Sequence, residues 1–367
     1  MLTGPRAQID HRALRHNLTV ARRHAPDSRV LAVIKANAYG HGMEPVAGAL
    51  RDADGFAVAR VEEGLRLRAA GVDKPILILA GALFSEEVDA ASRHDMALAV
   101  HHEEQVALLE RMRTVRPLRV WLKVDTGMHR LGVDPGVVPA VLERLRGCTA
   151  VDPRIGLMTH LANADDPRDP LSDLQCGRLR ALGRQGQPLS IGNSGGILAI
   201  RGARSDWVRP GIMLYGASPF TGRSAEELGL VPVMTLRARI ISVRHLRRGD
   251  RVGYGGTFVC PEDMPVAVAA VGYGDGYPRH APAGTPVLVN GVRAPLVGRV
   301  SMDSISVDVR GVPKVDVGDE VTLWGASLPV EEIAGLAGTI SYELFCGLNT
   351  RVRREYLKDS TGNGFER

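Results

Sequence analysis

The chain has 367 residues, of which 44% are hydrophobic, 24% are charged and only 4% are aromatic, and its formal net charge is +5. This length exceeds the usual size of one compact core, which predicts one large and one smaller domain. The sequence contains no run of about 18 apolar residues, the length that suits a membrane-spanning helix. Its arginines are scattered through helix-like segments, a pattern typical of solvated helix faces rather than of a nucleic-acid-binding surface.

The first six residues, MLTGPR, contain no apolar segment of a signal peptide and run directly into a helix-like pattern, so we expect a cytoplasmic protein. Four cysteines, at positions 148, 176, 260 and 346, are far apart and form no CxxC motif or Cys/His cluster. That spacing argues against a disulfide framework and against a zinc site. We therefore expect reduced cysteines and no metal.

From residue 30 onward, short apolar runs alternate with amphipathic, helix-like stretches. Repeated βα units indicate a parallel sheet, and eight of them fit an α/β fold of the (β/α)8, or TIM-like, barrel type. An open, doubly wound sheet is the alternative, although no GxGxxG motif follows the first strand. The predicted barrel strands are residues 30–34, 55–59, 75–80, 96–100, 119–124, 154–159, 189–192 and 206–208.

The pattern changes near residue 221, and from residue 234 the chain reads as successive strands without intervening helices. Asn290-Gly291, between two short apolar runs, is a strong signal for a two-residue hairpin turn. We therefore predict a barrel domain at residues 1–225 and a mainly β domain at residues 226–367. The predicted strands of this second domain are residues 234–243, 265–271, 285–289, 304–309 and 320–323.

Lys35 is predicted to lie at the carboxyl end of the first barrel strand, on the face where such barrels carry their active sites. Burial lowers the pKa of a lysine and leaves a free amine that can bond covalently to an aldehyde. A lysine that simply extends into solvent from a strand end is the alternative interpretation.

Two glycine-containing segments favour a cofactor role for Lys35. The sequence NSGG at 193–196 follows the seventh predicted strand and RPGI at 209–212 follows the eighth, where barrels frequently bind phosphate. Ser194 adds a hydroxyl group, and glycine lets the backbone approach an anion closely. Together these features indicate pyridoxal phosphate. From spacing alone, Tyr39, Lys123, Arg130 and His160 are also compatible with purely structural roles.

At these positions the chain resembles the bacterial alanine racemases, of the barrel class of pyridoxal-phosphate enzymes. The resemblance covers essentially the whole chain, in order. It is carried by KANAYGHG at 35–42, KVDTGMHRLG at 123–132, NSG at 193–195, RPGIMLYG at 209–216, GYGG at 253–256, GYGDGYPR at 272–279 and GRVSMD at 298–303.

The resemblance implies an enzyme that interconverts L-alanine and D-alanine, with two bases on opposite faces of the cofactor, Lys35 and Tyr254. It implies cofactor contacts by Lys35, Tyr39, His160, Asn193, Ser194, Arg209, Gly211 and Ile212. It implies substrate contacts by Arg130, Met302 and Tyr273, with Lys123 and Asp303 orienting Arg130. In similar enzymes the lysine at the position of Lys123 is often carbamylated, and Thr350 stands where some relatives place a phosphate-binding tyrosine.

The resemblance also implies a homodimer in which the second domain contributes Tyr254 to the active site of the partner subunit. Arg209 would face the ring nitrogen of the cofactor and, as a guanidinium, can only donate to it. The ring would then be a weaker electron sink than one that faces a carboxylate, which favours reprotonation over decarboxylation or transamination.

The closest alternative is a racemase of broader specificity, for serine or for basic amino acids. A cofactor-carrying barrel protein without appreciable catalysis is a second alternative, but such proteins lack the additional β domain. A decarboxylase of basic amino acids is a third, and Arg209 argues against it. The sequence leaves open whether the product would supply peptidoglycan or be degraded.

Overall fold

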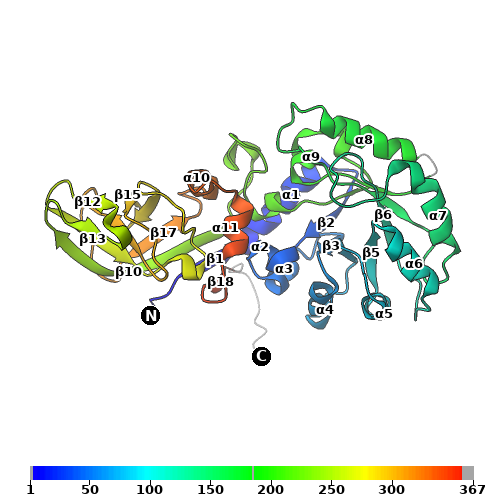
Figure 1. The fold of residues 1–367 in the computed structure, drawn as a ribbon, viewed down its shortest axis with the longest axis horizontal. Helices are drawn as coiled ribbons and strands as arrows, with labels where there is room; N and C mark the ends of the chain where they lie inside the picture. Colours follow the sequence, from blue (N-terminus) through cyan, green and yellow to red (C-terminus); the bar gives the residue numbers. More distant parts are fainter. Residues whose placement is uncertain (1–2, 184–185, 358–367) are drawn as a thin grey trace.

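The computed structural model describes residues 3–183 and 186–357, and Figure 1 shows two lobes joined side by side. One lobe is a closed barrel of eight parallel strands in which β9 pairs with β2. The predicted barrel is therefore confirmed. Its strands are β2 (Arg29–Val33), β3 (Gly55–Val58), β4 (Ile76–Ile78), β5 (Met96–Val100), β6 (Val120–Lys123), β7 (Gly156–Met158), β8 (Leu189–Ser190) and β9 (Trp207–Val208).

Helices surround this barrel, so most barrel strands are buried on both faces and read as continuous apolar runs. Several helices begin with acidic residues that cap free backbone N–H groups, as Glu63 does in α4 and Glu87 in α5. The helices of this lobe are α1 (His11–His24), α2 (Lys35–Tyr39), α3 (Met43–Ala49), α4 (Val61–Ala69), α5 (Ser85–Arg93), α6 (Glu103–Arg111), α7 (Val138–Gly147), α8 (Leu171–Leu182) and α9 (Ser194–Ala199).

The second lobe is mainly β, as expected, and is built on one eight-stranded sheet in the order β13-β16-β15-β14-β17-β10-β1-β18. The long strand β10 also pairs with β13. Asn290 and Gly291 both have positive φ and join β14 to β15, which confirms the predicted hairpin. The strands are β1 (Arg6–Asp10), β10 (Met234–Leu246), β13 (Met264–Ala269), β14 (Pro286–Val289), β15 (Val292–Val297), β16 (Ile305–Asp308), β17 (Glu320–Trp324) and β18 (Arg353–Leu357), with β11 (Arg251–Val252) and β12 (Phe258–Val259) forming a separate pair.

Two parts of the structure differ from the sequence-based expectation. Residues Arg6–Asp10 do not continue a helix-like pattern but form β1, which pairs with β10 and β18 of the second lobe and is an exception to the predicted division at residue 225. The second lobe also contains two helices, α10 (Val330–Leu336) and α11 (Ser341–Gly347). Helix α11 packs against α2 of the barrel lobe, so it lies beside the loop that carries Lys35.

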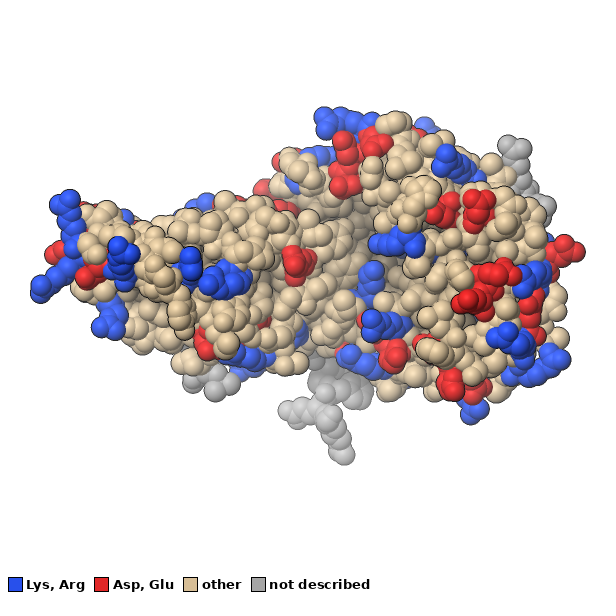
Figure 2. Space-filling view, viewed as in Figure 1, with Lys and Arg blue, Asp and Glu red and all other residues tan. Residues whose placement is uncertain are grey.

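On the face shown in Figure 2, basic and acidic side chains are interspersed over the barrel lobe. Within the described residues, no helix is both long and apolar enough to cross a membrane.

Candidate active site

A cavity of about 480 Å³ lies at the carboxyl ends of the barrel strands. Five of its polar lining residues each follow or end a different strand: Lys35 follows β2, Lys123 ends β6, His160 follows β7, Ser194 follows β8 and Arg209 follows β9. The remaining predicted cofactor residues Tyr39, Asn193, Gly211 and Ile212 also line it, as does Arg130. The barrel therefore brings these separate sequence segments to one place.

The loop after Lys35 has a left-handed backbone. Ala36, Asn37, Ala38 and Tyr39 have φ values of 51°, 55°, 54° and 50°, a conformation that costs about 1–2 kcal/mol for each L-residue. Hydrogen bonds hold the turn: Glu63 accepts from the N–H of Ala36 at 2.7 Å, and Asn37 accepts from Met43 at 3.1 Å. The surrounding structure therefore fixes a strained turn between Lys35 and Tyr39, as functional sites often do.

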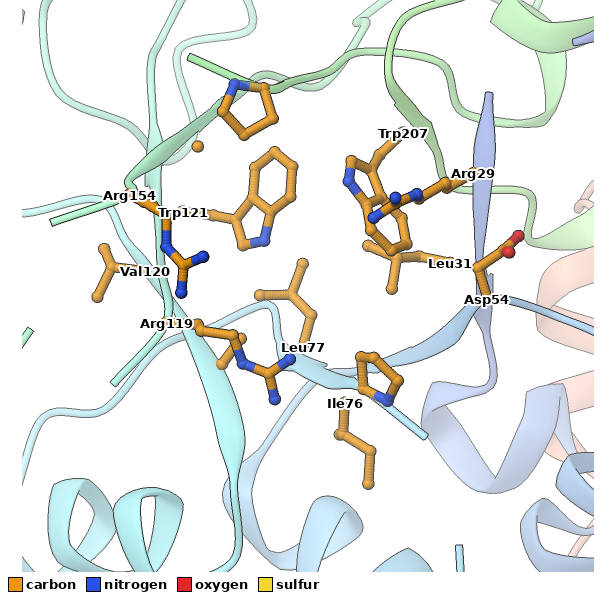
Figure 3. Close-up of a pocket in the computed structure, with 14 residues that line it drawn as sticks. Arg29, Leu31, Asp54, Ile76, Leu77, Arg119, Val120, Trp121, Arg154 and Trp207 are labelled. Carbon is orange, nitrogen blue, oxygen red and sulfur yellow. The ribbon is translucent and has the colours of Figure 1, made fainter. Parts of the chain in front are cut away.

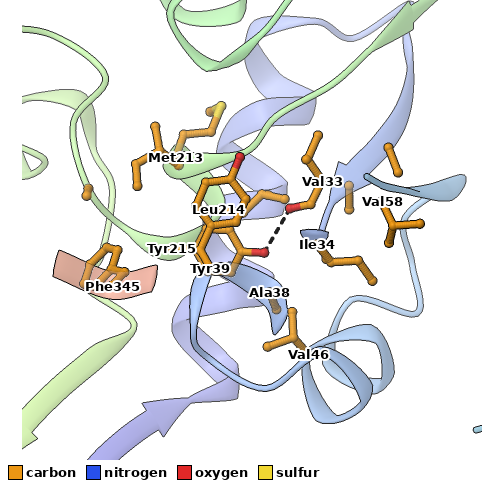
Figure 4. Close-up of a cluster of buried hydrophobic side chains, with 14 of the residues drawn as sticks. Val33, Ile34, Ala38, Tyr39, Val46, Val58, Met213, Leu214, Tyr215 and Phe345 are labelled. Atoms are coloured by element: carbon orange, nitrogen blue, oxygen red, sulfur yellow. Dashed lines mark hydrogen bonds between the residues drawn. The ribbon is translucent and has the colours of Figure 1, made fainter. Parts of the chain in front are cut away.

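Buried aromatic rings support this loop (Figure 4). Tyr39 stacks on Tyr215 with a centroid distance of 4.7 Å, and the Tyr215 hydroxyl donates to the carbonyl of Val33 at 2.9 Å. The ring of His41 lies 4.6 Å from Tyr215 and 4.9 Å from Phe345 of α11. Its Nδ1 is 2.8 Å from the Tyr39 carbonyl, so this nitrogen carries a proton, and burial lowers the pKa of His41 to about 4.

Ser194 and Gly211 form a small polar cradle at the end of β8 and β9. The Ser194 Oγ accepts hydrogen bonds from the N–H groups of Gly211 at 2.9 Å and Met213 at 3.3 Å. A Cβ atom on Gly211 would lie 2.5 Å from the Tyr39 hydroxyl oxygen, so only glycine fits there without a shift. Asn193 caps α9 by accepting from Gly196 at 2.9 Å.

The cavity concentrates positive charge. Its lining contains two lysines and two arginines, whereas no described lining residue is an aspartate or a glutamate. Burial lowers the pKa of Lys35, and Arg130 lowers it further. Burial and then the charge of Arg209 lower the pKa of Lys123 to about 8. Such a space suits a ligand with anionic groups and makes its lysine amines easy to deprotonate.

Arg209 is fully buried and anchored by neutral groups. Its guanidinium donates to the Ser190 Oγ at 2.5 Å and to the carbonyl of Ile191 at 3.3 Å, and it also contacts the carbonyl of Thr159. Burial lowers the pKa of Arg209 to about 10, so it stays charged at neutral pH. Burial and the neighbouring charge of Arg209 lower the pKa of His160 to about 3, which leaves its ring neutral.

Four predicted site residues lie on the β lobe and do not line this cavity. Tyr254, Tyr273 and Met302 are 70%, 41% and 52% exposed, and Asp303 is ion-paired with Arg351 at 2.7 Å. The segment at 299–303 links them, because the N–H of Tyr273 donates to the carbonyl of Ser301 at 3.0 Å. In one subunit the structure therefore gives two separate groups, one at the barrel mouth and one on the β lobe.

Two family models match the chain, the alanine racemase N-terminal domain over residues 9–219 and the alanine racemase C-terminal domain over residues 233–356. A curated alanine racemase from Nitrosococcus oceani is 53% identical over 350 residues, covering 95% of this chain and 98% of the relative. The chain belongs to the alanine racemase family. This confirms the resemblance inferred from the sequence motifs.

Solved alanine racemase structures share the whole fold. The biosynthetic alanine racemase of Pseudomonas aeruginosa is 44% identical, with a TM-score of 0.93 over 97% of this chain and 100% of that chain. The alanine racemase of Bartonella henselae, described with covalently bound pyridoxal phosphate, is 30% identical, with a TM-score of 0.87 over 97% and 100% of the two chains.

Two ionisable residues of the racemase cavity were missed from the sequence, Tyr342 and Cys346 of α11. The Tyr342 ring lies 5.9 Å from that of Tyr39, and burial raises the pKa of Tyr342 to about 12. Nothing in the local sequence of α11 indicated a place in the barrel, since the helix belongs to the other lobe. Among the described residues of this racemase family member, no group of three or more His, Cys, Asp or Glu could hold a metal ion.

Proposed function

We propose that this member of the alanine racemase family binds pyridoxal phosphate and interconverts L-alanine and D-alanine. The observation that carries the proposal is the cavity at the barrel mouth, where a buried lysine, a serine–glycine cradle and two guanidinium groups meet without a described carboxylate in the lining. The Nitrosococcus and Pseudomonas relatives are named alanine racemases, which supports alanine as the substrate.

The residues present fit the cofactor. Lys35 would hold it covalently, and Ser194, Gly211, Ile212 and Tyr39 would receive its phosphate at the cradle. Asn193, His160 and Arg209 would lie along its ring, and the Bartonella relative with covalently bound pyridoxal phosphate supports this assignment. When bound, the cofactor withdraws electrons from the α-carbon of an attached amino acid and so makes its α-proton acidic.

Lys35 would act as the base on one face of the substrate. Its lowered pKa favours the neutral amine, which can accept the α-proton near neutral pH. Arg130 lines the cavity, whose described lining contains no carboxylate, and it would bind the substrate carboxylate. Arg209 would donate to the ring nitrogen of the cofactor, because it stays charged at neutral pH. The ring would then withdraw electrons less strongly than one facing a carboxylate, which favours reprotonation.

Tyr254 would act as the opposite base, supplied by a second copy of the chain. In Figure 1, β12, which follows Tyr254 closely, lies at the end of the β lobe remote from the barrel strands. One subunit therefore does not join Tyr254 to Lys35, which supports a homodimer with composite active sites. Tyr273 and Met302 would approach the substrate from the same partner surface, and Asp303 would approach Lys123 and Arg130.

Lys123 would be carbamylated, as in similar enzymes. The reaction joins the neutral amine to carbon dioxide and releases a proton, so the lowered pKa of Lys123, about 8, favours it. The carbamate is an anion and would lie beside the positive charges of Arg130 and Arg209. The same two charges disfavour the protonated form of Lys123. Lys123 would then help orient Arg130.

Purified protein with pyridoxal phosphate, assayed for loss of optical activity of L-alanine, L-serine, L-lysine and L-arginine, tests the proposal. Conversion of alanine much faster than the others supports it, and equal rates would favour a broader racemase. No conversion with cofactor bound would favour the non-catalytic carrier. Complementation of a D-alanine-requiring bacterium tests whether the enzyme can supply D-alanine for peptidoglycan, and cell fractionation tests the expected cytoplasmic location.

A further inference from the structure

A second cavity, of about 490 Å³, opens at the opposite end of the barrel (Figure 3). It is lined by residues at the amino ends of the strands: Arg29 begins β2, Trp207 begins β9, Arg119 directly precedes β6 and Arg154 precedes β7. TIM-like barrels are normally filled by packed side chains, so an open space of this size at this end requires an explanation.

Two indole rings shape this barrel-base pocket, which we define by Arg29, Arg119, Trp121, Arg154 and Trp207. Trp121 and Trp207 meet edge to face, with centroids 6.3 Å apart and planes at 85°. The Trp121 ring lies over Gly156, where a Cβ atom would be 2.5 Å from the ring, so glycine makes room for it. Large aromatic surfaces on a solvent-facing pocket suit the stacking of a planar ring.

Guanidinium groups lie on both sides of these rings. Figure 3 shows Arg119 and Arg154 together on one wall and Arg29 against Trp207 on the other, at 5.5 Å from the ring centroid. Arg154 uses Nε and Nη2 for Asp152, and Arg119 uses Nη2 for Asp95. Their Nη1 atoms make no hydrogen bond to the described residues and can donate to an anion, for which arginine is well suited.

We propose that the barrel-base pocket binds a planar aromatic phosphate of the nucleoside monophosphate class, with its ring against the tryptophans and its phosphate on Arg119 and Arg154. Indole rings and guanidinium groups line the same pocket, with Arg119 and Arg154 together on one wall, which suits a ligand with both a ring and an anionic group. The cavity volume suits a small molecule of this size. The site is distinct from the barrel mouth, because its residues lie at the other ends of the same strands.

Tryptophan fluorescence provides a direct readout. The chain has three tryptophans, of which two line the pocket and the third, Trp324, is fully buried in the β lobe. Holoenzyme, with its mouth cavity filled by cofactor, is titrated with adenosine 5′-monophosphate, with adenosine and with inorganic phosphate, and calorimetry repeats each titration. We expect saturable quenching by the monophosphate and affinities at least about tenfold lower for the two fragments.

The Arg119→Gln/Arg154→Gln variant should bind the monophosphate about tenfold more weakly or worse, because it loses charge-assisted hydrogen bonds. Arg168→Gln is the matched control, since Arg168 is exposed and pairs with the aspartate two residues before it, as Arg154 does. Trp207→Phe should reduce the quenching. No saturable binding, equal affinity for adenosine, or unchanged affinity in the double variant would overturn the proposal.

Discussion

The hydroxyl oxygen of Tyr39 lies so close to Gly211 that a Cβ atom at position 211 would be 2.5 Å from it. This contact joins the left-handed loop after Lys35 to the serine–glycine cradle at the end of the barrel. Both residues are buried: Tyr39 stacks on the Tyr215 ring, and the N–H of Gly211 donates to the Ser194 Oγ. The two parts of the proposed phosphate site therefore fix each other.

Gly211→Ala should weaken cofactor binding, because the new methyl group and the Tyr39 hydroxyl cannot both keep their places. Overpacking of this kind costs about 1–3 kcal/mol. The double variant Gly211→Ala/Tyr39→Phe removes the oxygen, and the next atom is 3.3 Å away, so it should bind the cofactor better than Gly211→Ala alone. Cofactor titration of all four forms measures the coupling, and strictly additive losses would contradict the contact.

Tyr254→Phe should retain the bound cofactor and lose racemisation by about 10²–10⁴-fold, because a phenyl ring cannot transfer a proton. The loss should be unequal for the two enantiomers, since Lys35 still serves one face. Exchange of the α-proton in deuterated water, followed separately for L-alanine and D-alanine, measures this. Tyr277→Phe, at a buried tyrosine of the same lobe, is the control, and equal exchange rates in Tyr254→Phe would remove Tyr254 from its role.

Mixing Lys35→Ala subunits with Tyr254→Phe subunits should restore activity that neither has alone. In a composite dimer, half of the randomly paired dimers are mixed and each contains one intact site, so roughly one quarter of the wild-type activity is expected. Activity assays after mild dissociation and reassociation test this. If both bases came from one subunit, mixing would restore nothing.

His41 predicts a loss of stability in acid. Its folded pKa is lowered to about 4 from 6.5, so as pH falls below 6.5 the unfolded chain binds a proton that the folded chain does not. Above pH 6.5 this contribution of His41 to the free energy of unfolding vanishes, and by pH 4 it destabilises the fold by about 3 kcal/mol. The free energy of unfolding, measured with denaturant, should therefore fall less steeply with acid in His41→Asn than in wild type. The variant His280→Gln, at an exposed histidine, should follow wild type.

The barrel was predictable because its strands are short apolar runs between amphipathic helices. Strand ends were predicted too long, as at residues 34, 80 and 192, because the chain there stays apolar while it leaves the ladder to form the cavity. Strand β1 was missed because it is short. Its alternation of buried and partly exposed residues spans only five positions, with Ala7 and Ile9 buried, which does not distinguish a strand from the start of a helix.

The site was predictable where one segment carried its own motif. Ten of the predicted residues, Lys35 among them, line one cavity because each follows or ends a barrel strand or lies in the loop beyond it. Tyr342 and Cys346 were missed because α11 reaches the barrel only through packing between lobes. The left-handed turn was also invisible, since it includes Ala36 and Ala38, which seldom adopt that conformation.

The most direct test of the central claim is to locate the cofactor on the chain. Holoenzyme is reduced with borohydride, digested, and its peptides are mapped by mass spectrometry, with Lys35→Ala as the parallel sample. The account predicts a reduced pyridoxyl phosphate group on Lys35 and its loss, with the visible absorbance of the bound cofactor, in the variant. A modified Lys123, the other lysine of the cavity, or an unmodified Lys35 would contradict it.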